Sequence, residues 1–210
     1  MSSTRTKGVL EEYGRLAPAY DRRWSFYIDR TVRETLRRLR VGPGARVLDV
    51  GCGTGALLEA LAASRPEAQL WGVDASSQML EVASRKLGPS VRLERGDAES
   101  LPFRDGAFDL VVSTNAFHYF HDPVRALAEM RRVLRAGGRV VITDWCDDYL
   151  ACRLCALYLR VFRRAHLRIQ RLEQCGRLLA RAGFTLQALD RYRIDWKWGL
   201  MTAVGEKPGS

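Results

Sequence analysis

The chain has 210 residues, of which 47% are hydrophobic and 28% charged, an ordinary composition for a globular protein. This length suits one substantial domain and is short for two domains joined by a linker. No apolar run approaches the roughly 18–20 residues of a membrane-spanning helix, and the N-terminus lacks the apolar segment of a secretory signal. We therefore expect a single domain over residues 1–210 with a cytoplasmic location.

Charge and cysteine content narrow the partners only in part. The formal net charge is +10, which attracts nucleic acid, anionic lipid or acidic small molecules without selecting among them. An arginine-rich composition alone would also produce this charge.

The five cysteines fit a reducing compartment better than a disulfide framework. Cys152 and Cys155 have C-x-x-C spacing, but no further zinc ligands are evident nearby, so we interpret them as small buried residues and expect no metal.

Apolar stretches of strand character alternate with segments of helical period, which is typical of a parallel sheet wrapped by helices. Helices are predicted over 7–40, 55–64, 76–86, 123–138 and 148–182, the last one broken near Ile169. Strands are predicted over 45–50, 69–73, 91–95, 108–113 and 139–143, with a C-terminal pair over 184–189 and 200–204. This order predicts an α/β fold, a doubly wound, seven-stranded mixed sheet with an antiparallel C-terminal hairpin and helices on both faces.

A glycine-rich run, Val47–Gly55 (VLDVGCGTG), joins the first predicted strand to the following helix. Glycines take backbone angles closed to other residues and let a ligand approach the main chain. Because dinucleotide enzymes carry similar loops, the glycines alone do not identify the ligand. Asp49 is more specific, since a carboxylate here would repel a pyrophosphate but suits a ligand with ammonium or sulfonium groups.

Two further acidic residues end the second and third predicted strands. Asp74 lies about twenty residues beyond the glycine loop, where a carboxylate can accept hydrogen bonds from ribose hydroxyls. It could also cap the helix that starts near Ser76, and the two roles are compatible. Asp97 is placed to accept from an adenine amino group, and Ala98 offers a backbone N–H. Three acidic residues at three successive strand ends thus converge on one ligand.

Three motifs in this order resemble those of class I S-adenosylmethionine-dependent methyltransferases: Val47–Gly55, Gly96–Phe103 (GDAESLPF) and Glu129–Gly138 (EMRRVLRAGG). Within that class the chain is most similar to the methyltransferase type 11 group, which contains the ubiquinone and menaquinone biosynthesis C-methyltransferases and many natural-product enzymes. The opening run Tyr13–Asp21 (YGRLAPAYD) also resembles that group. The resemblance implies a Rossmann-like fold, S-adenosyl-L-methionine as cofactor, S-adenosyl-L-homocysteine as product, and O-, C- or N-methylation of a small-molecule acceptor.

The resemblance also implies roles for parts of the chain. Residues 1–40 would form an N-terminal helical cap, 45–145 the cofactor-binding core, 148–182 a helical substrate lid and 184–207 the C-terminal hairpin. The implied cofactor-binding residues are Tyr20, Asp49, Gly51, Cys52, Gly53, Asp74, Ala75, Met79, Asp97, Ala98 and Ser113. Among them the glycines would approach the methionine part and Asp74 the ribose. Met79 would pack on the adenine, although on an amphipathic helix it could equally be a core residue.

The implied catalytic candidate is His118. The fourth strand is followed by Phe117–His121 (FHYFH), where members of the group often carry a His-His pair, and His118 matches its first member. It could order the loop, contact the substrate or act as a general base, since an imidazole pKa of about 6.5 suits proton removal at neutral pH. A base is optional, because a sulfonium is already a strong electrophile. His121 and His166 are interpreted as surface or structural residues.

The expected lid combines arginine with apolar residues at helical spacing. The arginines are Arg153, Arg160, Arg164, Arg168 and Arg171, and the apolar face comprises Leu154, Leu157, Tyr158, Val161 and Phe162. A basic amphipathic helix can lie on an anionic membrane surface, which would suit a lipophilic acceptor such as a quinone, a lipid or a natural product. Alternatively, the arginines form a solvated face on a helix whose other side packs on the sheet.

Other functions share parts of this pattern. A nucleic-acid methyltransferase would explain the positive charge. However, the fourth strand leads into Ser113–Phe117 (STNAF), without the Asn/Asp-Pro-Pro-aromatic motif of amino-methylating base enzymes, so nucleic acid is not the expected partner. A non-catalytic, cofactor-binding partner subunit and a nicotinamide oxidoreductase are two further alternatives. The acceptor atom, the natural substrate and the oligomeric state stay open.

Overall fold

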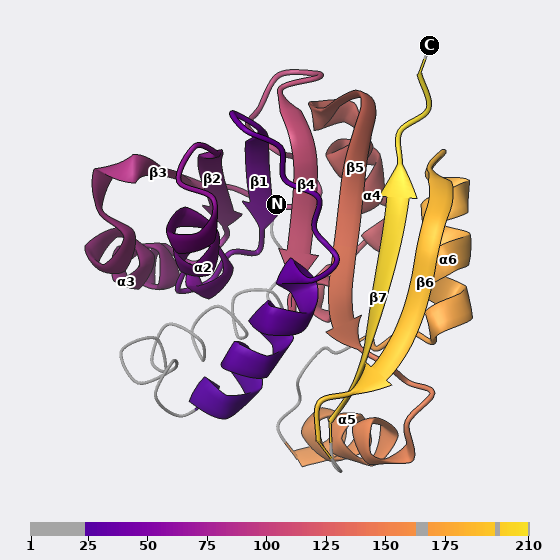
Figure 1. Cartoon of the computed structure of the whole chain (residues 1–210). Coiled ribbons are helices and arrows are strands. Elements are labelled where there is room, and N and C mark those ends of the chain that lie inside the picture. The colour runs from indigo at the N-terminus through magenta and orange to yellow at the C-terminus, as the bar shows by residue number, and fades with distance from the viewer. Residues whose placement is uncertain (1–23, 163–167, 196–197, 210) are drawn as a thin grey trace.

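The computed structural model describes residues 24–162, 168–195 and 198–209 (Figure 1). Within these residues seven strands form one sheet, in the order β3-β2-β1-β4-β5-β7-β6. The pairs among β1 to β5 are parallel, whereas β7 is antiparallel to both β5 and β6. This arrangement confirms the predicted doubly wound sheet with its antiparallel C-terminal hairpin.

The bounds of the elements follow the prediction closely in the first half of the chain. The strands are β1 (Arg46–Val50), β2 (Gln69–Asp74), β3 (Val91–Arg95), β4 (Phe108–Thr114), β5 (Leu134–Trp145), β6 (Thr185–Arg193) and β7 (Gly199–Glu206). The helices are one over 24–36, α2 (Ala56–Ser64), α3 (Ser77–Leu87), α4 (Pro123–Val133), α5 (Leu150–Phe162) and α6 (Leu172–Arg181). Two short 3₁₀ turns are η1 (Gly88–Ser90) and η2 (Phe117–Tyr119).

Side-chain capping explains where two of these helices begin. The Ser76 hydroxyl accepts a hydrogen bond from the backbone N–H of Met79 and so starts α3. The carboxylate of Asp122 accepts from the N–H groups of Val124 and Arg125, and proline follows it at the first helical position of α4. Both starts lie where the sequence predicted them.

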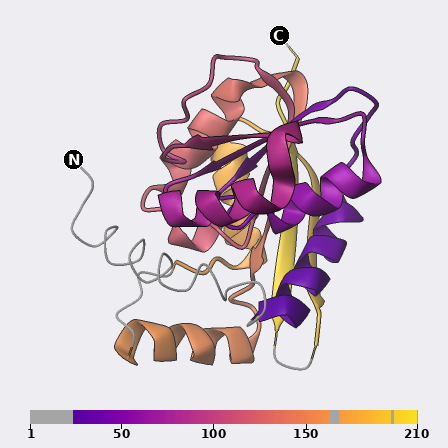
Figure 2. The same cartoon turned by 90° about the vertical axis from the view of Figure 1, so that its left-hand side faces the viewer.

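Helices cover both faces of the sheet (Figure 2). On one face the core contains Leu127 and Met130 of α4 together with Leu179 of α6. On the other face it contains Leu58 of α2, with Leu36 of the 24–36 helix packed against it. Along the central strands, alternate side chains enter the two cores, so these strands are apolar on both faces, as parallel strands in such a fold are.

The strand order reverses between β1 and β4, which creates the switch point where ligands bind in open α/β sheets. In the register, Asp49 pairs with Gly72 on one side and with Val112 on the other. The carboxyl ends of β1, β2 and β4 therefore meet at one edge of the sheet, and the chain connections at this edge carry the predicted cofactor-binding residues.

Several predicted boundaries in the second half of the chain were wrong. Helix α4 ends at Val133 rather than at 138, and β5 already begins at Leu134. Leu134 is buried and pairs with Phe108, and Gly137 has a φ of 68°, which a helix does not allow. The C-terminal strands extend beyond 184–189 and 200–204, because the edge strand β6 continues through polar, exposed residues that give no apolar signal.

The helical region over 148–182 is divided as predicted, with Ile169 in the break between α5 and α6. The predicted single stripe of arginines is therefore wrong. Arg168 and Arg171 lie beyond the end of α5 and do not share a helix with Arg153. The Arg160 side chain and residues Arg164 and His166 lie outside the described part of the structure, as does Tyr20. No helix among the described residues is long and apolar enough to cross a membrane.

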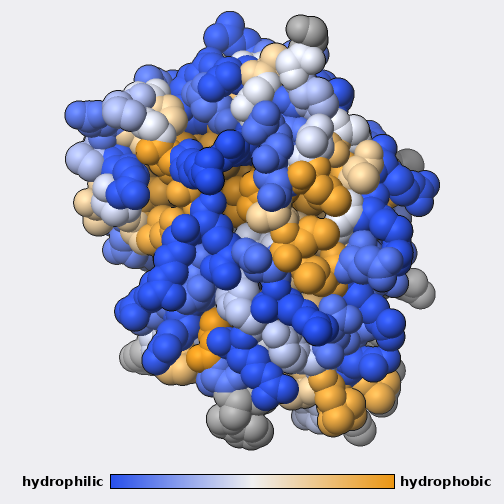
Figure 3. All heavy atoms as spheres, turned by 45° about the vertical axis from the view of Figure 1, so that its right-hand side comes forward, coloured by the Kyte–Doolittle hydropathy of each residue, from blue (hydrophilic) through white to orange (hydrophobic). Residues whose placement is uncertain are grey.

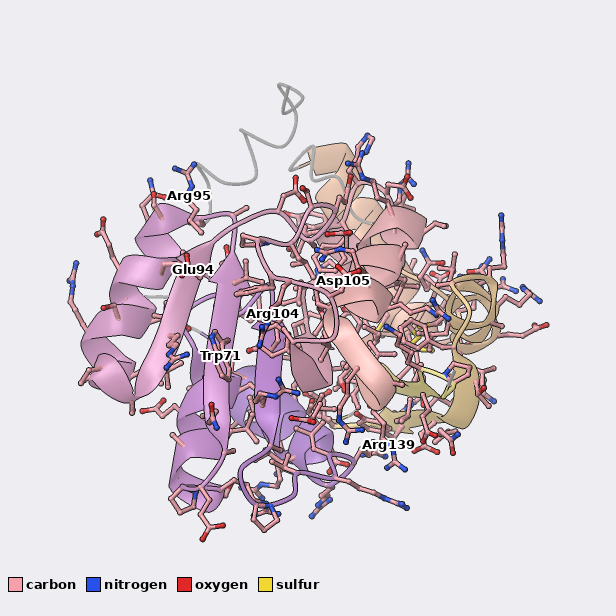
Figure 4. The ribbon with its side chains drawn as sticks, turned by 90° about the horizontal axis from the view of Figure 1, so that it is seen from above. Trp71, Glu94, Arg95, Arg104, Asp105 and Arg139 are labelled. Atoms are coloured by element: carbon pink, nitrogen blue, oxygen red, sulfur yellow. The ribbon has the colours of Figure 1, made fainter. Side chains whose placement is uncertain are left out.

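The loop over 96–107, from β3 to β4, contains no helix, and its arginine, Arg104, is exposed (Figure 4). The Arg92 guanidinium lies 5.1 Å from the centre of the Trp71 ring on β2. Trp71 in turn meets Phe108 edge-on, with 5.3 Å between the ring centres. Figure 4 labels Arg104 on this loop and Arg139 on β5 in the same view.

Candidate functional site

The glycine turn that follows β1 is anchored to the end of β2. The backbone N–H groups of Gly51 and Cys52 donate to the carbonyl oxygen of Val73, at 2.8 and 3.1 Å. Gly51 and Gly53 have φ angles of 75° and 52°, in the left-handed region that glycine adopts without strain. A Cβ atom at position 51 would also collide with the side chain of Ala116. The turn therefore requires glycine for both backbone angle and space.

Asp74 at the end of β2 holds this turn against the start of α3. Its Oδ2 accepts a hydrogen bond from the Gly53 N–H at 2.9 Å, and its Oδ1 accepts from the Ser76 N–H at 2.8 Å. Burial raises the pKa of Asp74, while these backbone hydrogen bonds oppose the rise. An ionised carboxylate has about four acceptor positions, so Asp74 can accept a further hydrogen bond beside those from the backbone, and its contact with a ribose stays a prediction.

Asp49, the last but one residue of β1, is almost completely buried, with 2% of its surface exposed. Its Oδ1 has no hydrogen-bond partner among the described residues. Burial, and secondarily the charge of Asp74, raise the pKa of Asp49 to about 8. A buried carboxyl without a partner is costly to a fold, so its presence beside the glycine turn indicates a ligand that it binds.

Two further polar atoms at the neighbouring strand end have no partner within the described residues. They are the hydroxyl oxygens of Ser113 and Thr114, at the end of β4, and both atoms are buried. Successive side chains of a strand point to opposite faces, so the two hydroxyl groups lie on different sides of the sheet. The carboxyl of Asp49 would fit the ammonium group of a ligand such as S-adenosylmethionine.

The residues predicted to bind the adenine flank the same edge. The backbone N–H of Gly96 donates to the Asp74 carbonyl oxygen at 3.1 Å, which places the turn after β3 beside the end of β2. In that turn Asp97 is exposed and accepts from the Glu99 N–H at 3.0 Å, and Ala98 is half-buried. Met79 on α3 is buried. Adenine contact by these residues stays a prediction.

A clamp from α4 fixes the loop that carries Asp97. The Arg132 guanidinium donates to the carbonyl oxygens of Phe103 at 2.7 Å and Leu101 at 3.0 Å. Glu129 accepts from the Leu101 N–H at 2.8 Å and from Arg132. These contacts lower the pKa of Glu129, mainly through the hydrogen bond with Arg132. Glu129 and Arg132, both in the motif Glu129–Gly138, thus hold the loop that carries Asp97.

His118 lies in η2, directly after β4, and only 4% of its surface is exposed. Its Nδ1 is 2.6 Å from Oδ1 of Asp144, and its backbone N–H donates to Oδ2 of the same carboxylate at 2.8 Å. The imidazole also stacks on Trp145, with 5.3 Å between ring centres and 17° between planes. These contacts order the loop. Because Nδ1 contacts Asp144, Nε2 is the ring nitrogen that could contact a further partner.

Several residues at this edge were not predicted. Asn115, after β4, has a φ of 57°, and its side-chain oxygen accepts from the Tyr27 hydroxyl at 2.6 Å. The Trp145 indole N–H donates to the same hydroxyl at 2.5 Å. Tyr27, Trp145 and Trp198 form an aromatic cluster with Trp24 packed against it. The separation of Tyr27 and Asn115 along the chain left no local signal for this contact.

The five cysteines are free thiols, and all but the half-buried Cys155 are buried. Burial raises the pKa of Cys146 and Cys175 to about 12, which keeps both protonated. Cys52 in the glycine turn is likewise a buried thiol. Its predicted contact with the cofactor would therefore be made by its backbone. Among the described residues, no three potential ligands gather into a metal site.

Comparison with known proteins agrees with this geometry. Residues 48–142 match the family model described as a methyltransferase domain. The chain is 38% identical over 146 residues to a demethylmenaquinone methyltransferase of Deinococcus radiodurans. The aligned region covers 66% of this chain and 61% of that protein. It is 35% identical over 152 residues to a ubiquinone/menaquinone biosynthesis C-methyltransferase of Geotalea uraniireducens, which covers 68% and 65%. The match thus spans less than two thirds of either relative.

The fold is also similar to a solved methyltransferase of Haloferax volcanii, determined in complex with the Trm112 methyltransferase activator. The TM-score is 0.84 at 22% identity, over 94% of this chain and 98% of that chain. The fold, the glycine turn and the match over residues 48–142 agree with an S-adenosylmethionine-dependent methyltransferase domain. In sequence the chain is similar to ubiquinone and menaquinone biosynthesis C-methyltransferases.

Proposed function

We propose that the protein transfers the methyl group of S-adenosylmethionine to a lipophilic small-molecule acceptor of the quinone or natural-product type. The observation that carries the cofactor half of this proposal is the unpaired, buried carboxyl of Asp49 beside the glycine turn. The acceptor half is supported by the relatives that act, by their names, in quinone biosynthesis.

In this proposal the carboxylate of Asp49 accepts from the ammonium of the cofactor, and the turn at Gly51–Gly53 leaves room for its methionine part. Asp74 accepts from the ribose hydroxyls, and Ser113 contacts the cofactor from the end of β4. Met79, Asp97 and Ala98 surround the adenine, with Ala75 beside the ribose. The bound cofactor supplies an electrophilic methyl group, so the protein chiefly has to align the acceptor atom with it.

We assign His118 as the general base for acceptors that lose a proton. Its Nδ1 is 2.6 Å from the Asp144 carboxylate, so a Nδ1–H tautomer would be favoured and Nε2 would be the proton acceptor. Asp144 is then a positioning residue, since it acts through the imidazole. The stack on Trp145 restricts the ring to one orientation.

Calorimetry with S-adenosylhomocysteine tests the cofactor half. The intact protein should bind it, and Asp74→Ala should bind about tenfold or more weakly, because one charged acceptor is lost. Glu67→Ala is a control, since Glu67 is an exposed carboxylate in the turn before β2, at the opposite edge of the sheet from the glycine turn, and should leave the affinity unchanged. Absence of binding by the intact protein would contradict the proposal.

A further inference from the structure

Helix α5 is apolar on two opposite faces. The inward face is packed, since Cys152 and Ala156 are buried and the Cys152 thiol lies 3.3 Å from the Gly199 carbonyl oxygen on β7. A surface helix ordinarily has one apolar side, which faces the core, and a polar side, which faces water. In α5 the apolar residues Leu154, Leu157 and Tyr158 lie on the solvent side, contrary to the alternative in which the side opposite the arginines packs on the sheet.

The outward face carries four large apolar side chains at i, i+4, i+7 and i+8 spacing. Leu150, Leu154, Leu157 and Tyr158 are 68%, 58%, 57% and 54% exposed, the four highest values among the large hydrophobic side chains of the described residues. Apolar side chains gather at the lower end of the molecule in Figure 3, the end at which α5 lies in Figure 1. A contiguous exposed stripe of this kind marks an interaction surface.

Positive charge borders the stripe. Between Leu150 and Phe162 the sequence contains arginine but neither aspartate nor glutamate, and the Arg153 side chain is half exposed. The half-exposed Arg171 lies close by, because both guanidinium groups approach the carboxylate of Asp147, at 3.8 and 3.9 Å. These distances are long for ion pairs, so the guanidinium groups can bind other anions. Apolar side chains bordered by arginine match a bilayer with anionic headgroups.

The stripe lies at the end of the molecule that contains the candidate site. Helix α5 follows β5 closely, and the carboxyl ends of the parallel strands point toward it in Figure 1. After α5, the backbone N–H of Arg168 donates to the carbonyl oxygen of His118 at 2.9 Å. The segment that follows α5 is therefore hydrogen-bonded to the loop that holds the candidate base.

We infer that the outward face of α5, formed by Leu150, Leu154, Leu157 and Tyr158 and bordered by Arg153, docks the protein on an anionic lipid surface. The helix lies in the headgroup region, with its leucines among the acyl chains and arginine at the phosphates. The role of this docking rests on the proposed function, because it would give the site access to an acceptor that resides in the membrane. Lipid binding itself needs neither cofactor nor turnover.

Vesicle flotation tests this inference with the full chain and no cofactor. The protein should float with vesicles of phosphatidylcholine mixed with phosphatidylglycerol, and high salt should reduce the bound fraction. Leu154→Glu should weaken binding about tenfold or more, because it removes an inserted side chain and adds a repelled charge. Leu186→Glu is the matched control. Leu186 is also an exposed leucine, but it lies at the start of β6, at the opposite end of the sheet, and should leave binding unchanged.

Three results would overturn the inference. The intact protein could fail to float with anionic vesicles, or it could bind phosphatidylcholine alone equally well, or Leu154→Glu could bind like the intact protein. A dimer in sedimentation analysis that Leu154→Glu dissociates, without vesicle binding, would assign the face to a second copy. Unchanged binding of S-adenosylhomocysteine by Leu154→Glu verifies the fold of the variant, and it separates failure of docking from failure of the proposed function.

Discussion

At the residue scale, the most informative group is the carboxyl of Asp49. Its pKa of about 8 lies well above the usual value of 3.8, so the folded protein binds a proton that the unfolded chain releases. This carboxyl therefore lowers the free energy of unfolding progressively as the pH rises from about 4 toward 8. A cationic ligand that pairs with the ionised carboxylate stabilises the folded state. Binding therefore offsets the free energy that burial of Asp49 costs the fold.

This linkage predicts how binding depends on pH. Between pH 6 and 8, the affinity for S-adenosylhomocysteine should rise by up to roughly tenfold per pH unit, because binding displaces the Asp49 proton. Calorimetry across this range measures the slope, and buffers of different ionisation enthalpy report the released proton. The isosteric variant Asp49→Asn should bind more weakly and with a flatter pH dependence. An equally steep slope in that variant would assign the proton to another group.

The His118–Asp144 pair predicts a different signature. His118→Gln should lower kcat by about 100-fold or more for an acceptor that loses a proton. Asp144→Asn should lower kcat as well, because the imidazole loses the acceptor of its Nδ1–H. Both variants should keep their affinity for S-adenosylhomocysteine. If Asp144→Asn changes only the melting temperature, its role is confined to holding the loop.

The position of the candidate site could be predicted because its acidic residues lie at or just after the ends of parallel strands. Asp49, Asp74 and Asp97 are read from the sequence in this way, and the fold brings all three to one edge, whereas their contact with a cofactor stays a prediction. The contact of Tyr27 with Asn115 could not be predicted, since it joins two segments that only the packing of the 24–36 helix brings together. Asp144 was missed because nothing along the chain indicates its pairing with His118.

At the element scale, the two edge strands of the sheet were predicted with unequal success. Strand β3 has the predicted bounds, whereas β6 continues beyond the predicted strand through exposed residues that resemble those of a loop. Leu134–Gly138 has the composition of a helix end, but Leu134 is fully buried beside Phe108, and this pairing extends β5. Tertiary contacts thus override the local preference in this segment.

The clamp between α4 and the loop over 96–107 gives an element-scale prediction. Arg132→Ala removes the donors to the carbonyl oxygens of Leu101 and Phe103, and should lower the free energy of unfolding by about 1–3 kcal/mol. Amide hydrogen exchange should become faster in the loop and stay unchanged in β1. Arg85→Ala, at an exposed pair on α3, is the control and should have little effect. Unchanged exchange in the loop would contradict the clamp.

At the scale of the whole molecule, the candidate site and the exposed face of α5 lie at the same end. The net charge of +10 gave no choice among partners by itself. The division of 148–182 into α5 and α6, and the outward position of Leu154 and Leu157, provide the geometry that the charge lacked. The sequence could not supply this geometry, because an apolar helical stripe packs inward in most surface helices.

The most direct test of the central claim is transfer of a labelled methyl group from S-adenosylmethionine into a cell extract, followed by separation into organic and aqueous phases. The account predicts label in the organic phase, with Asp49→Asn strongly reduced under the same conditions. Label confined to polar metabolites would contradict the proposed lipophilic acceptor but agree with methyltransferase activity. No transfer into any fraction by a protein that binds S-adenosylhomocysteine would contradict the proposed activity itself.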